Sequence, residues 1–155
     1  MNDSASLDHP FPARRRWMAL LARTKANHIA ALLGNCGALP THSTLRGPES
    51  GLVMVRGRAG GGGSAFNLGE MTVTRCTVRT DNGFVGHAYV AGREERRAEL
   101  AALVDALMQD QDRSANIETN VIAPLEQQQA EHRAGRASKA AATRVQFFAM
   151  QTMRA

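Results

Sequence analysis

The middle third of the chain contains three runs of apolar and β-branched residues that are typical of β-strands. A short β-type run covers residues 52–55, and a run rich in Thr and Val covers 71–80. An Asp-Asn-Gly turn at 81–83 leads into a third run at 84–90, and Asn-Gly between two such runs is a strong hairpin signal. The pattern predicts an antiparallel meander of at least three strands. One face of the second run is formed by Thr72, Thr74, Cys76 and Val78.

Apolar residues recur with helical spacing on both sides of this β-rich region. The clearest helix is 93–109, where large apolar side chains fall at i, i+3, i+4, i+7 and i+8. Apolar positions that begin after Arg14, and a second set after the candidate N-cap Thr24, predict two short antiparallel N-terminal helices or one bent helix. Pro124 suits the first turn of a long polar helix over 125–142.

Three features organise the C-terminal third. Ser114 is the expected N-cap of a short helical turn that carries Ile117. Gly135 is expected to interrupt the long polar helix. The run 145–150 is apolar and β-prone, so it is predicted either to return to the sheet or to dock on a partner.

These elements predict an α+β fold. An antiparallel sheet of about 3–5 strands would pack against the N-terminal helices, a central amphipathic helix (about 93–109) and the long polar C-terminal helix. Residues 1–13 lack periodicity and are predicted to be a flexible N-terminal arm. Residues 14–155 are predicted to form a single α+β domain, because 155 residues fit one domain of ordinary size.

Composition and charge restrict the classes of function. The net charge of +5 comes from 17 arginines against two lysines. Guanidinium groups suit phosphate and carboxylate partners, although a compositional bias explains the excess equally well. One Trp and one Tyr give little support to an RNA-stacking platform. No apolar run approaches the roughly 20 residues of a membrane helix, so no membrane partner is predicted and the expected location is the cytoplasm.

Cysteine and histidine spacing predicts no metal site. Cys36 and Cys76 form neither a CxxC motif nor a zinc-binding spacing. Buried, reduced thiols are the favoured interpretation, and a single disulfide stays open. The five histidines are scattered, and none pairs with another at a ligand spacing.

The glycine tract is the one motif that suggests phosphate contact. Gly60, Gly61, Gly62 and Gly63 follow Arg56 and Arg58. Glycines let backbone amides face an anion, and the arginines would strengthen its binding. However, the tract lacks the lysine of a phosphate-binding loop and precedes a strand rather than a helix. A connection between two strands therefore explains the tract equally well.

A search for catalytic constellations yields one weak pair and predicts no catalytic residue. Glu94, Glu95 and Glu99 lie near a helix start, where charge pairing and the helix dipole account for them. His87 and Tyr89 share one strand face and are the only suggestive pair.

Read as whole strings, the chain resembles the PhnG subunit of bacterial carbon–phosphorus lyase. The main stretches are Gly-Glu-Met-Thr-Val-Thr-Arg-Cys at 69–76, Asp-Asn-Gly-Phe-Val-Gly-His-Ala-Tyr-Val-Ala-Gly-Arg at 81–93, and the helix sequence at 98–109. Supporting stretches lie at 16–22, 51–55, 121–125 and 144–150. The match runs in order over about residues 16–150, which makes it more specific than any short motif.

The resemblance implies a subunit of a phosphonate-activating complex. In that family the G subunit assembles with H, I and J subunits. The complex uses MgATP as substrate and displaces adenine with a phosphonate such as methylphosphonate, giving α-D-ribose 1-methylphosphonate 5-triphosphate. The I subunit is credited with the displacement, and the J subunit later breaks the carbon–phosphorus bond. The resemblance carries over no catalytic residue and implies no cofactor bound by this chain alone.

Candidate surfaces follow from these observations. Arg56, Arg58 and Gly60 to Gly63 are the candidates for phosphate contact. Trp17, Phe147 and Phe148 are the candidates for a subunit interface, and an isolated chain is expected to be able to associate with its own copy. The alternative function is a small basic nucleic-acid-binding protein, which the arginine content motivates.

Overall fold

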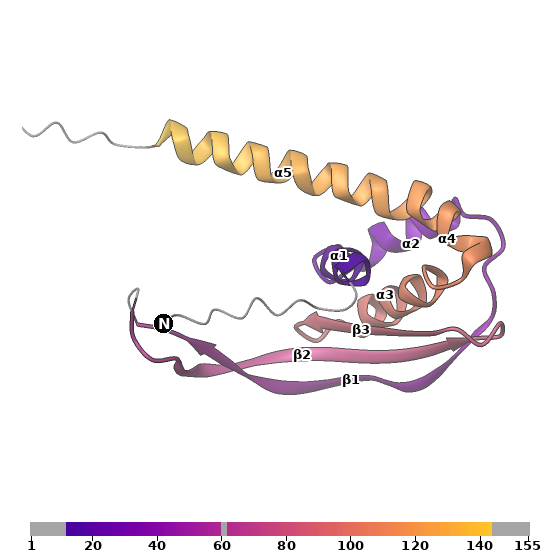
Figure 1. Ribbon diagram of the computed structural model, residues 1–155, viewed down its shortest axis with the longest axis horizontal. Helices are drawn as coiled ribbons and strands as arrows, with labels where there is room; N and C mark the ends of the chain where they lie inside the picture. The colour runs from indigo at the N-terminus through magenta and orange to yellow at the C-terminus, as the bar shows by residue number, and fades with distance from the viewer. Residues whose placement is uncertain (1–11, 60–61, 144–155) are drawn as a thin grey trace, which may run out of the picture.

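A computed structural model describes residues 12–59 and 62–143 of the chain (Figure 1). Helices lie over one face of an antiparallel sheet, so the chain has the predicted α+β fold. The elements, in chain order, are α1 (Pro12–Leu21), α2 (Ala26–Gly34), β1 (His42–Gly57), β2 (Phe66–Thr80), β3 (Val85–Ala91), α3 (Glu95–Leu107), α4 (Gln111–Ile117), the π-helical turn η1 (Glu118–Ile122) and α5 (Ala123–Ala142).

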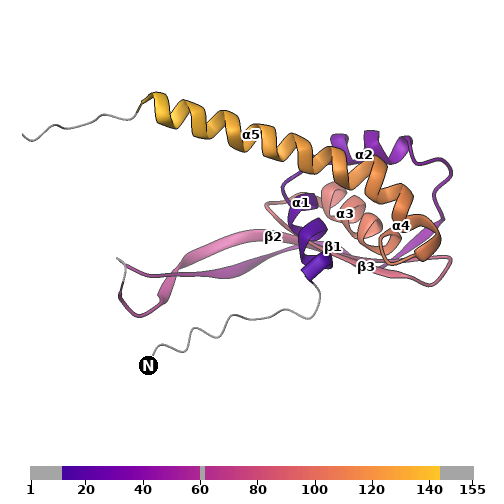
Figure 2. The ribbon, with the colours of Figure 1, turned by 45° about the horizontal axis from the view of Figure 1, so that its top comes forward.

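The sheet within these residues has three strands in the order β1-β2-β3. Strands β1 and β2 pair from His42↔Thr80 to Gly57↔Phe66, whereas β3 pairs only with residues 73–79 of β2. Residues 66–72 of β2 therefore pair with β1 alone, and the two strands form a two-stranded hairpin there. This hairpin projects past helices α1 to α4 (Figure 2).

From Thr74 to Arg79 strand β2 alternates as the sequence predicts, whereas the neighbouring Val73 is also buried. Thr74, Cys76 and Val78 are buried beneath the helices, while Arg75 and Arg79 are exposed on the opposite face. Because side chains on a strand alternate between faces, one face of β2 joins the core and the other stays outside. The core joins α3 and β3 to residues from α1, α2, α4, η1 and α5.

Close packing of α3 on β3 depends on a glycine. A Cβ at Gly86 would lie 1.9 Å from the carbonyl oxygen of Ala102 and 2.5 Å from the backbone nitrogen of Ala106. Ala98, Ala101 and Ala102 form part of the buried face of α3. Small residues on both elements thus let the helix backbone approach the strand.

Several predicted elements are confirmed, with changed boundaries. The two N-terminal helices, the meander, the central helix and the long polar helix are all present. Helix α1 begins at Pro12, inside the segment expected to be an arm, and residues 1–11 lie outside the described part of the chain. The predicted strand 145–150 also lies outside it.

Strand β1 is far longer than the predicted run 52–55. It begins at His42 and includes Pro48, which follows a cis peptide bond. The ladder with β2 is irregular on both sides of Arg46. An edge strand tolerates proline and bulges, because one side of its backbone needs no ladder partner.

Two predictions about the C-terminal helices are wrong. Asp110, not Ser114, is the N-cap of α4, because an Asp110 side-chain oxygen accepts from the backbone N–H of Asp112 at 3.0 Å. Gly135 does not interrupt α5, which continues to Ala142. A single glycine costs a helix only about 1 kcal/mol, so it weakens the helix without ending it.

Candidate functional site

The projecting β1–β2 hairpin carries most of the exposed large apolar side chains among the described residues. Leu52 and Met54 on β1 are 64% and 53% exposed. Their neighbour Val53 pairs with Met71 and so points to the opposite face, where Met71 is also exposed. Because both faces of this two-stranded ribbon carry exposed apolar side chains, the hairpin is suited to contact with other protein surfaces.

The apolar character continues towards the hairpin tip. Phe66 and Leu68 on β2 are 46% and 59% exposed. Leu68 lies over Gly57, since a Cβ there would come within 2.4 Å of Cδ1 of Leu68. The tip therefore combines aliphatic and aromatic groups that stay in solvent in the isolated chain.

The arginines predicted to contact phosphate lie at this same tip. Arg56 is exposed near the end of β1, and Arg58 is exposed just after it. Gly62 and Gly63 lie in the turn between the strands, whereas Gly60 and Gly61 fall outside the described residues. The structure thus brings both arginines to the end of the hairpin that holds the glycine tract, and the tract connects two antiparallel strands.

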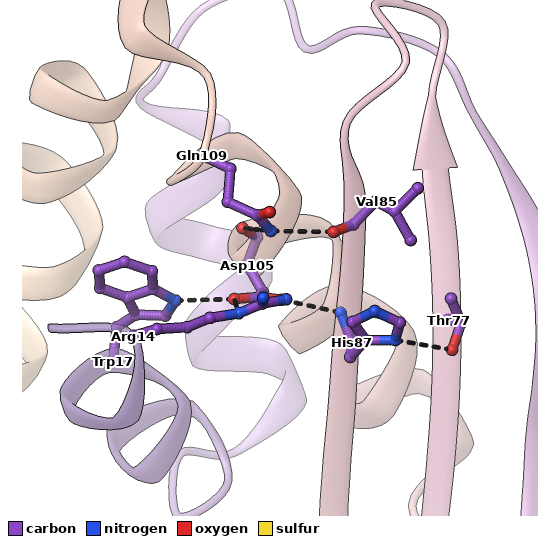
Figure 3. Close-up of polar contacts among 7 residues, drawn as sticks. All are labelled: Arg14, Trp17, Thr77, Val85, His87, Asp105 and Gln109. Carbon is purple, nitrogen blue, oxygen red and sulfur yellow. Dashed lines mark hydrogen bonds and ion pairs between the residues drawn. The ribbon is translucent and has the colours of Figure 1, made fainter. Parts of the chain in front are cut away.

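A buried carboxylate links helices α3 and α1 to strand β3, which forms the other edge of the sheet (Figure 3). Asp105 on α3 is completely buried, and it accepts from Nε and Nη2 of Arg14 at 3.0 and 2.6 Å. It also accepts from Nε1 of Trp17 at 2.9 Å and from the backbone N–H of His87 at 2.8 Å. The hydrogen bond to Asp105 raises the pKa of the Arg14 guanidinium. One carboxylate therefore fastens α1 and β3 to α3.

This cluster determines where Trp17 lies. The indole is partly buried against the core of its own chain, with its N–H bonded to Asp105. Its predicted role at a subunit interface stays a prediction, and so does that of Phe147 and Phe148, which lie outside the described residues. Sequence reasoning missed Asp105, although Ala98, Ala101, Ala102 and Asp105 share one helical face at i, i+3, i+4 and i+7.

Side chains from α3 and its surroundings also occupy the outer edge of β3. Asp105 accepts the N–H of His87, and Nε2 of Gln109 donates to the carbonyl of Val85 at 2.9 Å. Near the other end of the strand, Nη2 of Arg97 donates to the carbonyl of Ala91 at 2.6 Å. Three backbone groups on this edge, the N–H of His87 and the carbonyls of Val85 and Ala91, are therefore bonded to side chains of the same chain.

The outer face of the sheet carries polar groups that pair with one another. Glu49 accepts from Nε of Arg46 at 2.7 Å and of Arg75 at 2.6 Å, and these bonds lower the pKa of the Glu49 carboxyl. Nδ1 of His87 lies 3.1 Å from the hydroxyl of Thr77, while Tyr89 is half exposed.

No group of three potential metal ligands occurs among the described residues.

The cysteines are free thiols buried in the core. Burial raises the pKa of the Cys36 thiol, and burial followed by the nearby Glu99 charge raises that of Cys76. Of the two interpretations left open by the sequence, the structure has the reduced thiols.

Many arginines are neutralised within the fold. Ion pairs with carboxylates involve Arg14, Arg16, Arg46, Arg75, Arg97 and Arg113. These guanidinium groups are therefore engaged in contacts within the fold, while the net charge of +5 already counts their carboxylate partners. No helix in the described part of the chain is both long and apolar enough to cross a membrane.

Helix α5 leaves the body of the protein after its first turns. Leu125 is buried, and Nε2 of Gln129 donates to the carbonyl of Leu20 at 3.2 Å. From residue 131 to 142 every side chain is exposed. In both ribbon views α5 and the β1–β2 hairpin project from the same side of the molecule (Figures 1 and 2).

Comparison with known proteins gives the same family that the residue strings indicated. The family described as "Phosphonate metabolism protein PhnG" matches residues 12–154. A curated relative from Rhizobium meliloti (strain 1021) is 46% identical over 140 residues, which cover 88% of this chain and 87% of the relative. That protein is named "Alpha-D-ribose 1-methylphosphonate 5-triphosphate synthase subunit PhnG". With a family match over nearly the whole chain and identity at this level, the chain belongs to the PhnG family.

Proposed function

We propose that this chain is the G-type subunit of an α-D-ribose 1-methylphosphonate 5-triphosphate synthase. The observation that carries the proposal is the 46% identity to the Rhizobium meliloti subunit over 87–88% of both chains. The complex would displace adenine from MgATP with a phosphonate such as methylphosphonate, as a step of phosphonate degradation in the cytoplasm.

The proposed partners are H, I and J subunits of the same complex. Exposed apolar residues on both faces of the β1–β2 hairpin support a partner that encloses it. The free half of α5 supports a second contact on the same side of the molecule. In this arrangement the chain shapes a site whose chemistry belongs to the I-type subunit.

Assembly tests this proposal directly. The full chain, mixed with H-, I- and J-type subunits from one source, is expected to elute with them as a single complex. Replacing Leu52 and Leu68 by Asp would place charges in the proposed contact and should release the chain from the complex. Replacing Arg79, an exposed residue on the outer face, by Asp is the matched control. Elution of the unmodified chain apart from a competent set of partners would contradict the proposal.

Contact with substrate phosphate is proposed for Arg56, Arg58 and the glycines 60–63. The shared location of the arginines at the hairpin tip supports this role. In the assembled complex, Arg56→Gln with Arg58→Gln should raise the KM for MgATP or for phosphonate about tenfold or more, as expected when charge-assisted hydrogen bonds are lost. Arg79→Gln is the control, and unchanged constants in the double variant would exclude the contact.

The nucleic-acid alternative gains nothing from the structure or the relatives. Six of the arginines that motivated it are paired with carboxylates. We expect no binding to generic duplex DNA or RNA. Low salt is the condition for this test, because non-specific binding to nucleic acid is strongest there.

A further inference from the structure

Part of the outer edge of β3 has backbone groups that no described residue bonds. The N–H of His87 donates to Asp105, and further along the strand the carbonyl of Ala91 accepts from Arg97. The odd-numbered residues of β3 therefore direct their backbone groups away from β2. Between these two contacts, the C=O of His87, the N–H and C=O of Tyr89 and the N–H of Ala91 have no partner within the described part of the chain. Such an edge is a template for another strand.

A groove of about 530 Å³ lies between this edge and helix α1. Met18, Ala19 and Ala22 form its apolar side on α1, and His87 and Tyr89 line it from β3. Even-numbered residues of β3 are buried beneath the helices, whereas His87 and Tyr89 are exposed on the other face. A strand added to β3 here would therefore direct one face towards the apolar side chains of α1 and the other towards solvent.

We infer that residues 4–8 of this chain occupy the groove as a fourth strand, antiparallel to β3, with Ser6 opposite Tyr89. In this register Ser6 and Tyr89 exchange two backbone hydrogen bonds. On one side the N–H of Asp8 donates to the unbonded carbonyl of β3, and on the other the carbonyl of Ser4 accepts from the unbonded N–H. All four backbone groups of the edge are then satisfied.

The residue pattern of the segment fits this register. The sequence Ser-Ala-Ser-Leu-Asp at 4–8 alternates polar and apolar residues. Opposed residues of an antiparallel pair point to the same face, so Ser6 lies on the exposed face beside Tyr89. Ala5 and Leu7 then point towards the apolar side of α1, where they leave water.

Neighbouring registers fit less well. A shift of one residue in either direction turns polar side chains of the segment towards α1. A shift that places Ser4 opposite Tyr89 brings Asp3 against the same apolar side. The opposite shift places Pro10 where a residue must donate to the carbonyl of His87, and proline has no N–H.

The attachment of this segment to α1 favours it as the occupant. Arg14 in the first turns of α1 and the N–H of His87 bond to the same carboxylate of Asp105, so α1 begins beside this end of the exposed edge (Figure 3). Antiparallel pairing brings Asp8 to the same end. Residues 9–11 then connect the new strand to the start of α1, and this short tether gives the segment a high effective concentration at the groove.

Charge distinguishes this segment from the residues at the other end of the chain. Residues 1–11 contain two aspartates and no lysine or arginine. Arg14 and Arg15 line the groove, so the segment and its site have opposite charge. Residues 144–155 contain two arginines and no acidic residue. The inference concerns the sheet edge opposite to β1 and is independent of the proposed function.

A cysteine pair tests both the occupant and the register. Opposed residues that exchange ladder hydrogen bonds have Cα atoms about 5.5 Å apart, within the range of a disulfide. Ser6→Cys with Tyr89→Cys is therefore expected to form a disulfide within one chain under mild oxidation. Ser6→Cys with Arg75→Cys is the matched control, because Arg75 is exposed and pairs with Tyr89, but lies one strand further away, about 10 Å from Ser6.

Hydrogen exchange of the full chain tests the backbone bonds. The amide of Tyr89 is expected to be protected in the unmodified chain. Ser6→Pro removes the N–H that donates to the carbonyl of Tyr89, so it should speed exchange of the Tyr89 amide at least about tenfold. Ala5→Pro is the matched control, because the N–H of Ala5 points away from β3 in this register.

Each readout has results that would overturn the inference. The first is exchange of the Tyr89 amide at the rate of an unpaired residue in the unmodified chain. Protection that Ser6→Pro leaves unchanged would show that something else covers the edge. Among the cysteine variants, the contradicting results are no disulfide in the Ser6–Tyr89 pair, equal crosslinking of the Ser6–Arg75 control, or a disulfide that joins two chains.

Discussion

At the residue scale, Asp105 is a fully buried carboxylate whose oxygens accept four hydrogen bonds. Its side-chain oxygens are the acceptors in all four of these hydrogen bonds, and the donors belong to Arg14, Trp17 and the backbone of His87. A neutral amide at this position would direct its own N–H groups at donors. The cluster therefore requires a carboxylate, and not merely a side chain of the same size.

Asp105→Asn should lower the free energy of unfolding by about 2–4 kcal/mol, through lost charge-assisted bonds and an unpaired Arg14. The chain has a single Trp, so the fluorescence of Trp17 reports directly on the cluster during urea unfolding. Glu126→Gln is the control, because its contact with Arg16 is exposed and worth less than about 1 kcal/mol. Equal stabilities of the two variants would contradict this account of Asp105.

Gly86 is constrained by space instead of charge. Gly86→Ala forces a methyl group against the backbone of α3 and should cost about 1–3 kcal/mol or more, as overpacking does. Gly135→Ala provides the contrast, because its Cβ meets nothing within 4 Å and alanine favours a helix by about 1 kcal/mol. Urea denaturation should show the midpoint falling for the first variant and staying or rising for the second.

The two cysteines should be chemically quiet in the native state. Their thiol pKa values are raised, so near pH 8 each thiol carries less thiolate than an unperturbed cysteine and reacts more slowly. Alkylation should be slow in buffer and complete in urea. Rapid native labelling of either thiol would show that the core around it opens readily.

At the scale of elements, the sequence predicted those whose burial is regular. Strand β2 and helix α3 each bury one face, so their periods of two and 3.6 residues are visible in the sequence. Most of β1 was missed because Pro48 and the polar residues before 52 contradict strand patterning. The strand forms there because it is an edge held by β2.

The polar cluster was hidden for a related reason. In the sequence Asp105 looks like an ordinary polar residue of a helix, because its partners Arg14, Trp17 and His87 lie 91, 88 and 18 positions away. Local patterns do not encode such long-range pairs. By contrast, the glycine tract and its arginines could be placed between two strands from sequence alone.

Helix α5 has two halves that should differ in dynamics. Backbone amides in 131–142 should exchange with solvent at least about a hundredfold faster than those in the buried part of α3, because no side chain in that half is buried. Hydrogen exchange on the isolated chain measures this difference. Equal protection of the two segments would show that the free half is held by contacts that its exposure does not reveal.

At the scale of the whole molecule, the described residues leave two surfaces uncovered, namely the hairpin with its apolar faces and the exposed half of α5. A protein that functions alone gains nothing from such exposure, which favours association and aggregation. A subunit gains an interface. The family assignment and the surface properties therefore support the same account, in which the chain acts within a complex.

The central claim is tested most directly by adenine release from MgATP and methylphosphonate. The assay combines the H- and I-type subunits with and without this chain, and follows adenine and the ribose-triphosphate product. The account predicts that release with formation of the transfer product requires this chain. Release at the same rate without it, or no release from a complete and competent set of partners, would contradict the account.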